Sequence, residues 1–348
     1  MDEKQRNEFS NYLKYSAEKL IGTRAVPEIL LKEIERKLHS YSEDFGTYKV
    51  KSVAELSIEI AEKQNAREGL KTNFKELDEL SGGIPVSLIV LGARPGMGKT
   101  ALLLSMAFNL GFSEKRVGFV SLEMGTEMVI KRFNQMKVKA PGSAWEYIDI
   151  IEPTDFSIQA LIVAITDYYE KSSPSIIMID YLQLITLGGY VHNREREISY
   201  IMSELKRLSK KLDVPIIVSS QLSRAVETRG GEKRPQLSDL RESGAIEQES
   251  DLVWFLYRPE YYGICENEDG DSTQGLAELI IAKNKFGPCD TISLAFIGVA
   301  ALFRDIDHDG KSQSFPPGHL KEYDSFKEMY EEIQKKKELD SNSEEPPF

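Results

Sequence analysis

The residues with the clearest chemistry lie in a glycine-rich loop that also carries a lysine and a threonine. Residues 91–100 read LGARPGMGKT, between an apolar run and the apolar segment 101–110. Gly96 and Gly98 allow backbone angles that turn successive amide hydrogens inward, which forms a nest for phosphate oxygens. The helix expected after this loop adds the positive end of its dipole. The pattern is that of a Walker A loop, and it predicts a bound nucleoside triphosphate.

The end of the loop completes the expected phosphate site. Lys99 would place a positive charge between the outer phosphates, and the hydroxyl of Thr100 is placed to coordinate Mg²⁺. Ala93 stands where this motif usually has its first glycine, a mild departure because the later glycines form the tight part of the cradle. ATP and Mg²⁺ are therefore the expected ligands. The expected nucleotide-binding residues of the loop are Arg94, Pro95, Gly96, Met97, Gly98, Lys99, Thr100 and Ala101.

Three polar residues at the ends of predicted strands could act on the nucleotide. Asp180 closes the apolar run 176–180 and is expected to hold Mg²⁺ through water, as in a Walker B strand. Glu123 follows the strand 117–121, which should neighbour the phosphate-loop strand, and it could deprotonate the attacking water. A glutamate placed at a helix N-terminus for the sake of the dipole explains it equally well. Gln221 could sense the γ-phosphate or could be an ordinary polar loop residue.

The elements that must position these residues alternate along the chain. Short β-branched runs occur at 86–91, 117–121, 148–151, 176–180, 215–219, 252–257, 278–282 and 291–296. The first five alternate with helix-like segments, and the last three follow each other closely. This order predicts an α/β fold in which a mostly parallel twisted sheet carries helices on both faces and ends in an antiparallel portion.

Polar, helix-prone segments flank this core. The expected organisation is a short helical region at 1–50, a linker helix at 51–68, a nucleotide-binding domain at 69–305, and a C-terminal extension with a helix and an acidic tail at 306–348. Val53, Leu56 and Ile60 form an apolar stripe on the linker helix, and this stripe must be buried. Packing on its own domain and docking on a neighbouring subunit explain the stripe about equally well.

The composition narrows the class of protein. The 348 residues carry a formal net charge of −12 and are 41% hydrophobic. These values exclude wholesale disorder and a uniformly basic nucleic-acid coat, but they allow a local basic channel. The two cysteines, Cys265 and Cys289, are far apart, which argues against a disulfide framework or a cysteine zinc site. No apolar run approaches the ~20 residues that cross a bilayer, so a cytoplasmic protein without membrane contact is expected.

Five runs outside the phosphate loop closely resemble DnaB-like replicative helicases. They are SLEM at 121–124, IDYLQL at 179–184, SQLSR at 220–224, SDLRESGAIEQ at 238–248 and IAKNKFGP at 281–288. The resemblance covers about residues 52 to 305. It implies a RecA-like P-loop ATPase core that assembles as a homo-oligomer, a hexameric ring around single-stranded DNA. It further implies a helicase that moves 5′ to 3′ in DNA replication.

The resemblance also implies roles for individual residues around the nucleotide. Glu123 matches the hydrolytic glutamate, Gln221 matches the γ-phosphate sensor, and Arg132 matches an arginine that contacts the nucleotide. Lys283 and Lys285 match a basic pair offered to the nucleotide of the neighbouring subunit. Lys285 departs from the family pattern, which commonly has an arginine finger here. Lysine keeps the charge but loses the bidentate fork.

A further segment matches the part of the family that contacts DNA. Arg241, Glu242 and Gly244 match the loop that touches the DNA backbone. The stretch 224–244 is basic within an acidic protein, which suits a grip on phosphates without base readout. Without the resemblance, a solvated charged loop is the favoured interpretation. The basic residues of the stretch are Arg224, Arg229, Lys233, Arg234 and Arg241.

The resemblance suggests a helicase loader and a primase as further partners. The short region before the linker helix predicts that the larger N-terminal collar of full-length members is reduced or absent, which favours a phage, plasmid or specialised protein. Two alternatives stay open. One is a ring-forming DNA-binding scaffold whose ATPase regulates loading, and the other is a recombination ATPase of the RecA-like class.

Overall fold

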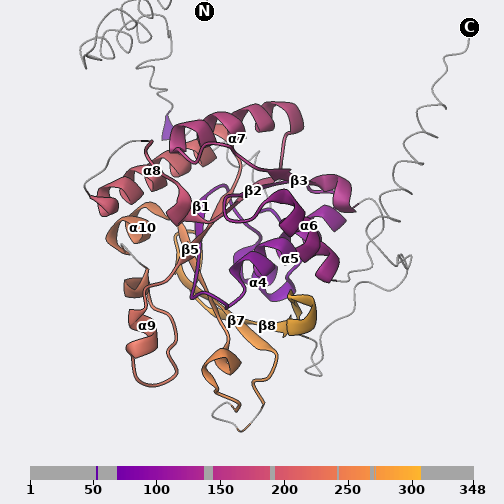
Figure 1. Ribbon diagram of the computed structural model, residues 1–348, viewed down its shortest axis with the longest axis vertical. Coiled ribbons are helices and arrows are strands. Elements are labelled where there is room, and N and C mark those ends of the chain that lie inside the picture. The colour runs from indigo at the N-terminus through magenta and orange to yellow at the C-terminus, as the bar shows by residue number, and fades with distance from the viewer. Residues whose placement is uncertain are drawn as a thin grey trace, which may run out of the picture. The chain divides into compact units, whose positions relative to one another are not determined.

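The computed structural model describes residues 52–53, 69–136, 144–188, 193–240, 243–266, 270 and 272–306 (Figure 1). The chain divides into two compact units, residues 1–66 and 67–348, and all the elements below belong to the second. The predicted helical region 1–50, the linker helix apart from residues 52 and 53, and the C-terminal extension after residue 306 lie outside the described residues.

A mixed sheet forms the centre of the second unit. Its strands are β1 (Leu88–Ala93), β2 (Val117–Ser121), β3 (Ile148–Ile151), β4 (Ile176–Asp180), β5 (Ile216–Gln221), β6 (Leu252–Tyr257), β7 (Leu276–Asn284), β8 (Thr291–Ile297) and β9 (Leu302–Asp305). They lie in the order β3-β2-β4-β5-β1-β6-β7-β8-β9. All pairs from β3 to β6 are parallel, and those from β6 to β9 are antiparallel. The predicted mostly parallel α/β sheet is confirmed.

Helices connect the parallel strands. The α-helices are α4 (Lys75–Ser81), α5 (Lys99–Phe112), α6 (Thr126–Gln135), α7 (Ile158–Ser172), α8 (Arg194–Leu212), α9 (Ala225–Thr228) and α10 (Ser243–Glu249). Short 3-10 helices lie at η1 (Ala144–Tyr147), η2 (Leu182–Leu184), η3 (Leu237–Asp239), η4 (Pro259–Tyr262) and η5 (Gly298–Ala300). No helix within these described residues has the length and apolar character needed to cross a bilayer.

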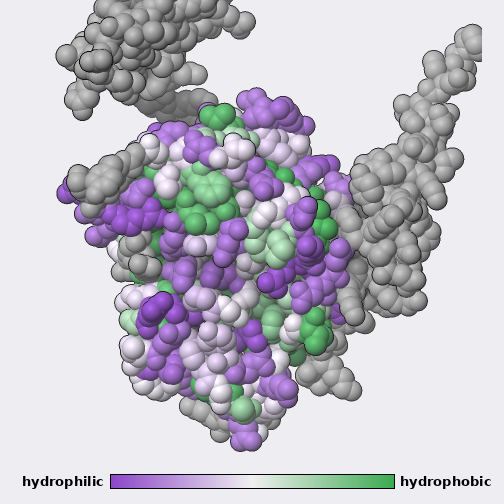
Figure 2. Space-filling model, in the orientation of Figure 1, coloured by the Kyte–Doolittle hydropathy of each residue, from purple (hydrophilic) through white to green (hydrophobic). Residues whose placement is uncertain are grey.

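The two faces of the sheet bury two separate cores. Ile89 and Leu91 of β1 pack with α5, whereas Leu88 and Val90 pack with α7 and α8, as expected for side chains that alternate across a strand. Figure 1 shows α7 and α8 on one side of the sheet and α5 and α6 on the other. The molecular face in Figure 2 carries only scattered groups of hydrophobic residues among hydrophilic ones. The sheet is therefore covered on both faces and leaves its strand ends to form the site.

The position of β2 differs from the prediction. We expected the strand 117–121 to neighbour the phosphate-loop strand, but β2 pairs with β3 and β4, and both β4 and β5 separate it from β1. The intervening places are filled by strands that come later in the chain. The 14-residue helix α5 is long enough to carry the chain across three strand spacings of about 4.8 Å each.

The antiparallel part of the sheet also differs in detail. We grouped 252–257 with the closing antiparallel strands, yet β6 pairs in parallel with β1 and only its other edge, against β7, is antiparallel. Strand β9, which pairs with β8 across the short turn at η5, was not predicted from the sequence. With four residues, β9 is too short to show a clear alternating pattern.

Candidate functional site

The phosphate loop joins β1 to α5 and depends on two glycines. β1 ends at Ala93 and α5 begins at Lys99. Gly96 and Gly98 have φ angles of 80° and 103°, in the left-handed region that side chains rarely adopt. A Cβ at Gly98 would also lie 3.1 Å from the ring of Phe303. The backbone angles therefore favour glycine at both positions, and the ring of Phe303 also leaves little space for a side chain at Gly98.

The loop borders a cavity of about 380 Å³ at the carboxyl ends of the parallel strands, the edge where open α/β sheets bind their ligands. The cavity gathers most of the residues predicted to bind or act on the nucleotide. Those that line it are Pro95, Gly96, Gly98, Lys99, Thr100, Ala101, Glu123, Arg132, Asp180 and Gln221. Residues from several parallel strands thus converge on it although β1 and β2 are not adjacent, because parallel strands end at one edge of the sheet.

Lys99 is held at the floor of the cavity. Its Nζ donates a hydrogen bond to the carbonyl oxygen of Ala93 at 3.1 Å. Burial lowers the pKa of Lys99, and the nearby carboxylates of Asp180 and Glu123 oppose that shift. Phosphate oxygens would replace the missing solvation of this ammonium group and favour its charged form.

Thr100 and Asp180 place hard oxygen ligands together. The Thr100 hydroxyl donates to Oδ2 of Asp180 at 2.5 Å, and Ser219 on β5 donates to the other carboxylate oxygen. A hydroxyl and a carboxylate are ligands that suit Mg²⁺, which usually takes one or two protein oxygens together with water and phosphate. No group of three or more His, Cys, Asp or Glu side chains that could hold a metal ion occurs in the described part of the chain. Mg²⁺ therefore fits here as a partner of the nucleotide.

Two other predicted residues reach the cavity from the ends of β2 and β5. The backbone N–H of Leu122 donates to the carbonyl of Asp180 at 2.9 Å, which fixes the segment that presents Glu123. Gln183, which the sequence analysis did not single out, accepts the backbone N–H of Gln221 at 3.2 Å. The amide nitrogen of Gln183 also donates to Ser220 at 2.9 Å. Gln183 thus positions the end of β5.

Arg94 and Met97 do not line the cavity. The guanidinium of Arg94 is buried, and it donates to Glu227 at 2.9 Å and to the carbonyl of Leu222 at 2.7 Å. Met97 is buried in the core. The side chain of Arg94 therefore ties the phosphate loop to α9, while the backbone of the loop faces the cavity.

The remaining wall of the cavity was not predicted from the sequence. Phe296 near the end of β8 and Gly298 and Ala301 in the turn before β9 line it, and Gln135 and Tyr181 complete the lining. The guanidinium of Arg258 lies 3.8 Å from the centre of the Phe296 ring. Because the pattern of β9 is too short to recognise, nothing in the sequence indicated that this turn folds back over the phosphate loop.

Comparisons with known proteins show the family to which the chain belongs. Residues 69–146 and 143–305 match the family described as "DnaB-like helicase C terminal domain". The chain belongs to the DnaB-like helicase family. It is 36% identical over 319 residues to the replicative DNA helicase DnaB of Pasteurella multocida, a match that covers 80% of this chain and 66% of that protein. The chain thus spans just under two thirds of the length of that relative.

Two solved structures of this family are similar to the chain. The first is an ATPase domain that is 33% identical, with a TM-score of 0.65, and the match covers 74% of this chain and all of that one. The second is a DnaB-like replicative helicase, solved in a study of its interactions with primase. It is 31% identical, with a TM-score of 0.63 over 87% of this chain and 78% of that one.

In this member of the DnaB-like family, Lys283 and Lys285 lie away from the cavity. Lys283 pairs in register with Val253 near the start of β6, and the backbone N–H of Lys285 donates to the carbonyl of Asp251. The N–H of Asp251 in turn donates to the carbonyl of Leu88, the first residue of β1. Five residues of extended strand, about 17 Å, separate that level from Ala93. Lys285 is thus at the opposite end of the sheet from its own phosphate loop, and the Nζ of Lys283 reaches the same end, where it donates to the carbonyl of Ser250.

The segment matched to the DNA loop of DnaB-like helicases is more ordered than a solvated charged loop. Arg241 and Glu242 lie outside the described residues, and Gly244 is exposed in the first turn of α10. Leu222 and Leu240 form a bridge that closes the segment between them, and the N–H of Ser223 donates to the carbonyl of Asp239 at 2.8 Å.

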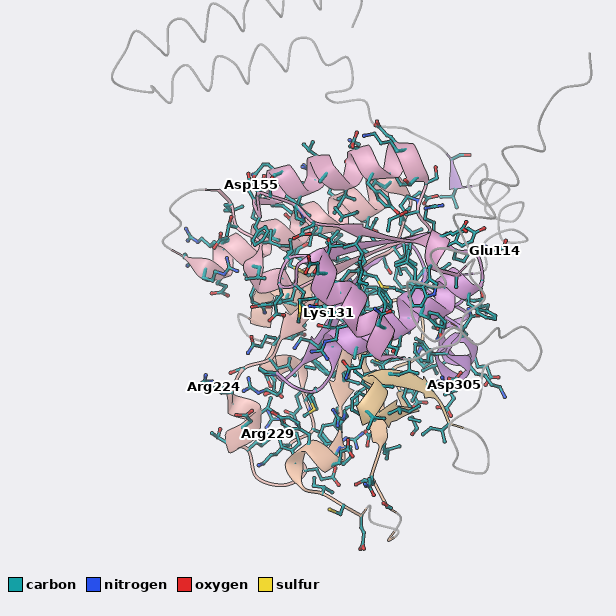
Figure 3. All side chains as sticks on the ribbon, turned by 45° about the vertical axis from the view of Figure 1, so that its right-hand side comes forward. Glu114, Lys131, Asp155, Arg224, Arg229 and Asp305 are labelled. Carbon is teal, nitrogen blue, oxygen red and sulfur yellow. The ribbon has the colours of Figure 1, made fainter. Side chains whose placement is uncertain are left out.

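Two arginines of this segment are used inside the fold. Arg229 pairs with the buried carboxylate of Asp239, and Arg234 donates to Glu278 on β7 at 3.1 Å. Each of these two side chains thus pairs with a carboxylate of the fold, which the basic stretch alone did not indicate. Arg224 is exposed and projects from the same arm of the molecule as Arg229 (Figure 3).

Proposed function

We propose that the chain is the motor of an ATP-driven DNA helicase that assembles as a hexameric ring, binds single-stranded DNA and translocates 5′ to 3′ during DNA replication. The relatives that it matches are named replicative DNA helicases. Since these relatives are bacterial proteins that act on DNA, we place this chain in the cytoplasm. A primase is the proposed partner, since a similar structure concerns a helicase and its interactions with primase; a helicase loader is a further one.

The observation that carries the proposal is the division of the site between the two ends of the sheet. Lys99, Thr100, Glu123 and Asp180 meet at one end, while Lys283 and Lys285 lie at the other. A subunit by itself would leave the charge that develops on the γ-phosphate without the second set of cations. A ring in which one subunit offers its lysines to the cavity of the next supplies them.

The residues of the chain would share the work of hydrolysis. The loop amides and Lys99 bind and orient the triphosphate, with Arg132 and the wall at Phe296 beside it. Glu123 takes the proton of the attacking water, and Gln221 contacts the γ-phosphate. Thr100 and Asp180 would hold Mg²⁺, which when bound neutralises charge on the outer phosphates.

DNA would be held through its phosphates. Arg241, Glu242 and the backbone at Gly244 are the proposed contacts, with the exposed Arg224 on the same segment as an additional cation. Backbone contacts of this kind bind any sequence, which suits translocation.

A forked-DNA unwinding assay tests the function. With ATP and Mg²⁺, the protein should displace the paired strand of a fork with a 5′ tail and leave a fork with only a 3′ tail intact. ATP hydrolysis stimulated by single strands without strand displacement would support the scaffold alternative. Hydrolysis that does not respond to DNA would refute both interpretations.

A further inference from the structure

At the far end of the sheet, Lys285 and Lys206 both pair with one carboxylate, that of Asp251. The Nζ atoms of Lys285 and Lys206 each lie 2.9 Å from Oδ1 of Asp251. The Asp251 side chain is 10% exposed, whereas that of Lys285 is 41% exposed. The ion pair is therefore anchored in the interior at its acidic end and open to solvent at its basic end.

Asp251 is itself fixed by the backbone of the phosphate-loop strand. Its N–H donates to the carbonyl of Leu88 at 2.9 Å, and its Oδ2 accepts the N–H of Leu88 at 3.2 Å. Burial acts to raise the pKa of Asp251, but the hydrogen bonds from Lys285, Lys206 and Leu88 outweigh it, so that the pKa is lowered. The carboxylate is thus a charged and rigid point of attachment.

We propose that Asp251 is a positioning residue that holds the ammonium group of Lys285 in place for the nucleotide of the neighbouring subunit. The proposal rests on the shared-site function above. A lysine has a flexible four-carbon stem and lacks the planar fork that pre-organises an arginine. Ordering such a side chain costs rotamer freedom. The fixed carboxylate of Asp251, bound to the terminal Nζ, orders the side chain before the nucleotide arrives.

Because Lys206 also pairs with Asp251, the carboxylate does not fully neutralise the charge of Lys285. Lys206 shares the same carboxylate oxygen and also donates to the carbonyl of Glu249 at 2.8 Å, so the charge of Asp251 is divided between two ammonium groups. An ammonium group has three N–H donors, so the bond to Asp251 leaves Lys285 two with which to meet a phosphate oxygen. The hydrogen bond with Asp251 raises the pKa of Lys285, which keeps the group charged.

Lys283 stands beside this pair and is held differently. It donates to the carbonyl of Glu247 and, at 3.0 Å, to that of Ser250. Burial lowers the pKa of Lys283, and the positive charge of Lys285 lowers it further, although the Glu247 carboxylate opposes both. The cluster as a whole therefore favours the approach of an additional anion.

The test is a double-mutant cycle on assembled rings. In Asp251→Asn, the side-chain oxygen can still accept the N–H of Leu88, but the charge that orders Lys285 is gone. We expect kcat for ATP hydrolysis at saturating single-stranded DNA to fall about tenfold, with KM for ATP unchanged. In a Lys285→Ala background the same substitution should have no further effect on kcat, because the ammonium group of Lys285 is no longer there to be positioned.

A second variant and a control guard against simple misfolding. Asp251→Glu keeps the charge but moves it by one methylene, and it should lower kcat by a smaller factor while melting like the parent. Asp167→Asn, which breaks an exposed pair with Lys171 on α7, should leave kcat unchanged. Native mass spectrometry verifies that every variant forms rings.

The possible outcomes distinguish failure of the shared-site function from failure of the positioning role of Asp251 alone. If Lys285→Ala itself leaves kcat unchanged, the shared-site function fails. If Lys285→Ala lowers kcat but neither change at Asp251 does, only the positioning role fails. The role is also overturned if Asp251→Asn lowers kcat as much in the Lys285→Ala background as alone, since that is the pattern of a structural residue.

Discussion

A site divided between subunits makes a quantitative prediction for mixed rings. Glu123→Gln removes the proton acceptor from the cavity, whereas Lys285→Ala removes a cation from the far end of the sheet. Each variant alone should be nearly inactive. In a mixed ring, an active site forms wherever a Lys285→Ala subunit presents its intact Glu123 to a Glu123→Gln neighbour that retains Lys285.

The expected activity follows from the geometry of a closed ring. If a fraction x of subunits carries Lys285→Ala, a given boundary is complete with probability x(1 − x). Equal mixing should therefore restore about a quarter of the wild-type rate per boundary, since every heterologous boundary in a closed ring is equivalent. The rate should follow a parabola in x with its maximum at equal amounts.

The assay is steady-state ATP hydrolysis with saturating single-stranded DNA, after the two variants are unfolded, mixed and reassembled together. Native mass spectrometry confirms that the rings are mixed, and rings reassembled separately and then combined serve as the control. Mixed rings that stay as inactive as either parent would refute independent shared sites. The same result is expected if both residues act within one subunit, since neither variant then has a complete site at any x.

Three further predictions use other parts of the structure. Glu123→Gln should bind ATP normally while single-turnover hydrolysis falls by about 10²–10⁴, because the phosphate cradle is intact; normal turnover would remove Glu123 from its role. Arg241→Ala should weaken single-stranded DNA binding equally for all sequences and reduce the salt slope by about 1, whereas a changed sequence preference would indicate base contact. Burial raises the pKa of Asp305 (Figure 3) from 3.8 to about 6, and Glu76 adds to the shift. Since this folded-state pKa lies above the unfolded value, stability is lost as pH rises from about 4 through 6. Urea unfolding should therefore give Asp305→Asn the same free energy of unfolding as the parent near pH 4. At pH 7.5 the variant should be about 1 kcal/mol more stable, after allowance for solvent screening. A difference in stability that does not change with pH would contradict this reasoning.

Much of the nucleotide site could be predicted because its chemistry is local in sequence. The Gly96–Gly98 geometry, Lys99 and Thr100 follow one another in a single turn from strand to helix, where residue type dictates backbone angle and ligand. Asp180, Glu123 and Gln221 were recognised because each ends an apolar run. The edge of a parallel sheet then brings them together whatever the order of the strands.

What the sequence did not predict depends on contacts between distant segments. The connections between strands decide the place of β2 in the sheet, and the residues 117–121 do not indicate which strands lie beside it. Arg94, Arg229 and Arg234 looked like cations for phosphate, but each finds a carboxylate more than four residues away in sequence. Only the fold reveals which of the many arginines in a basic segment retains an exposed charge.

The short helix α10 relates the proposed DNA contacts to the distant lysines. Gly244, which matches the DNA loop, lies in its first turn, and Glu247 and Ser250 at its other end offer their carbonyls to Lys283. Asp251, which pairs with Lys285, follows directly. If, as proposed, DNA contacts the start of α10 and the lysines serve the next subunit, these bonds link the two proposed sites through one short helix.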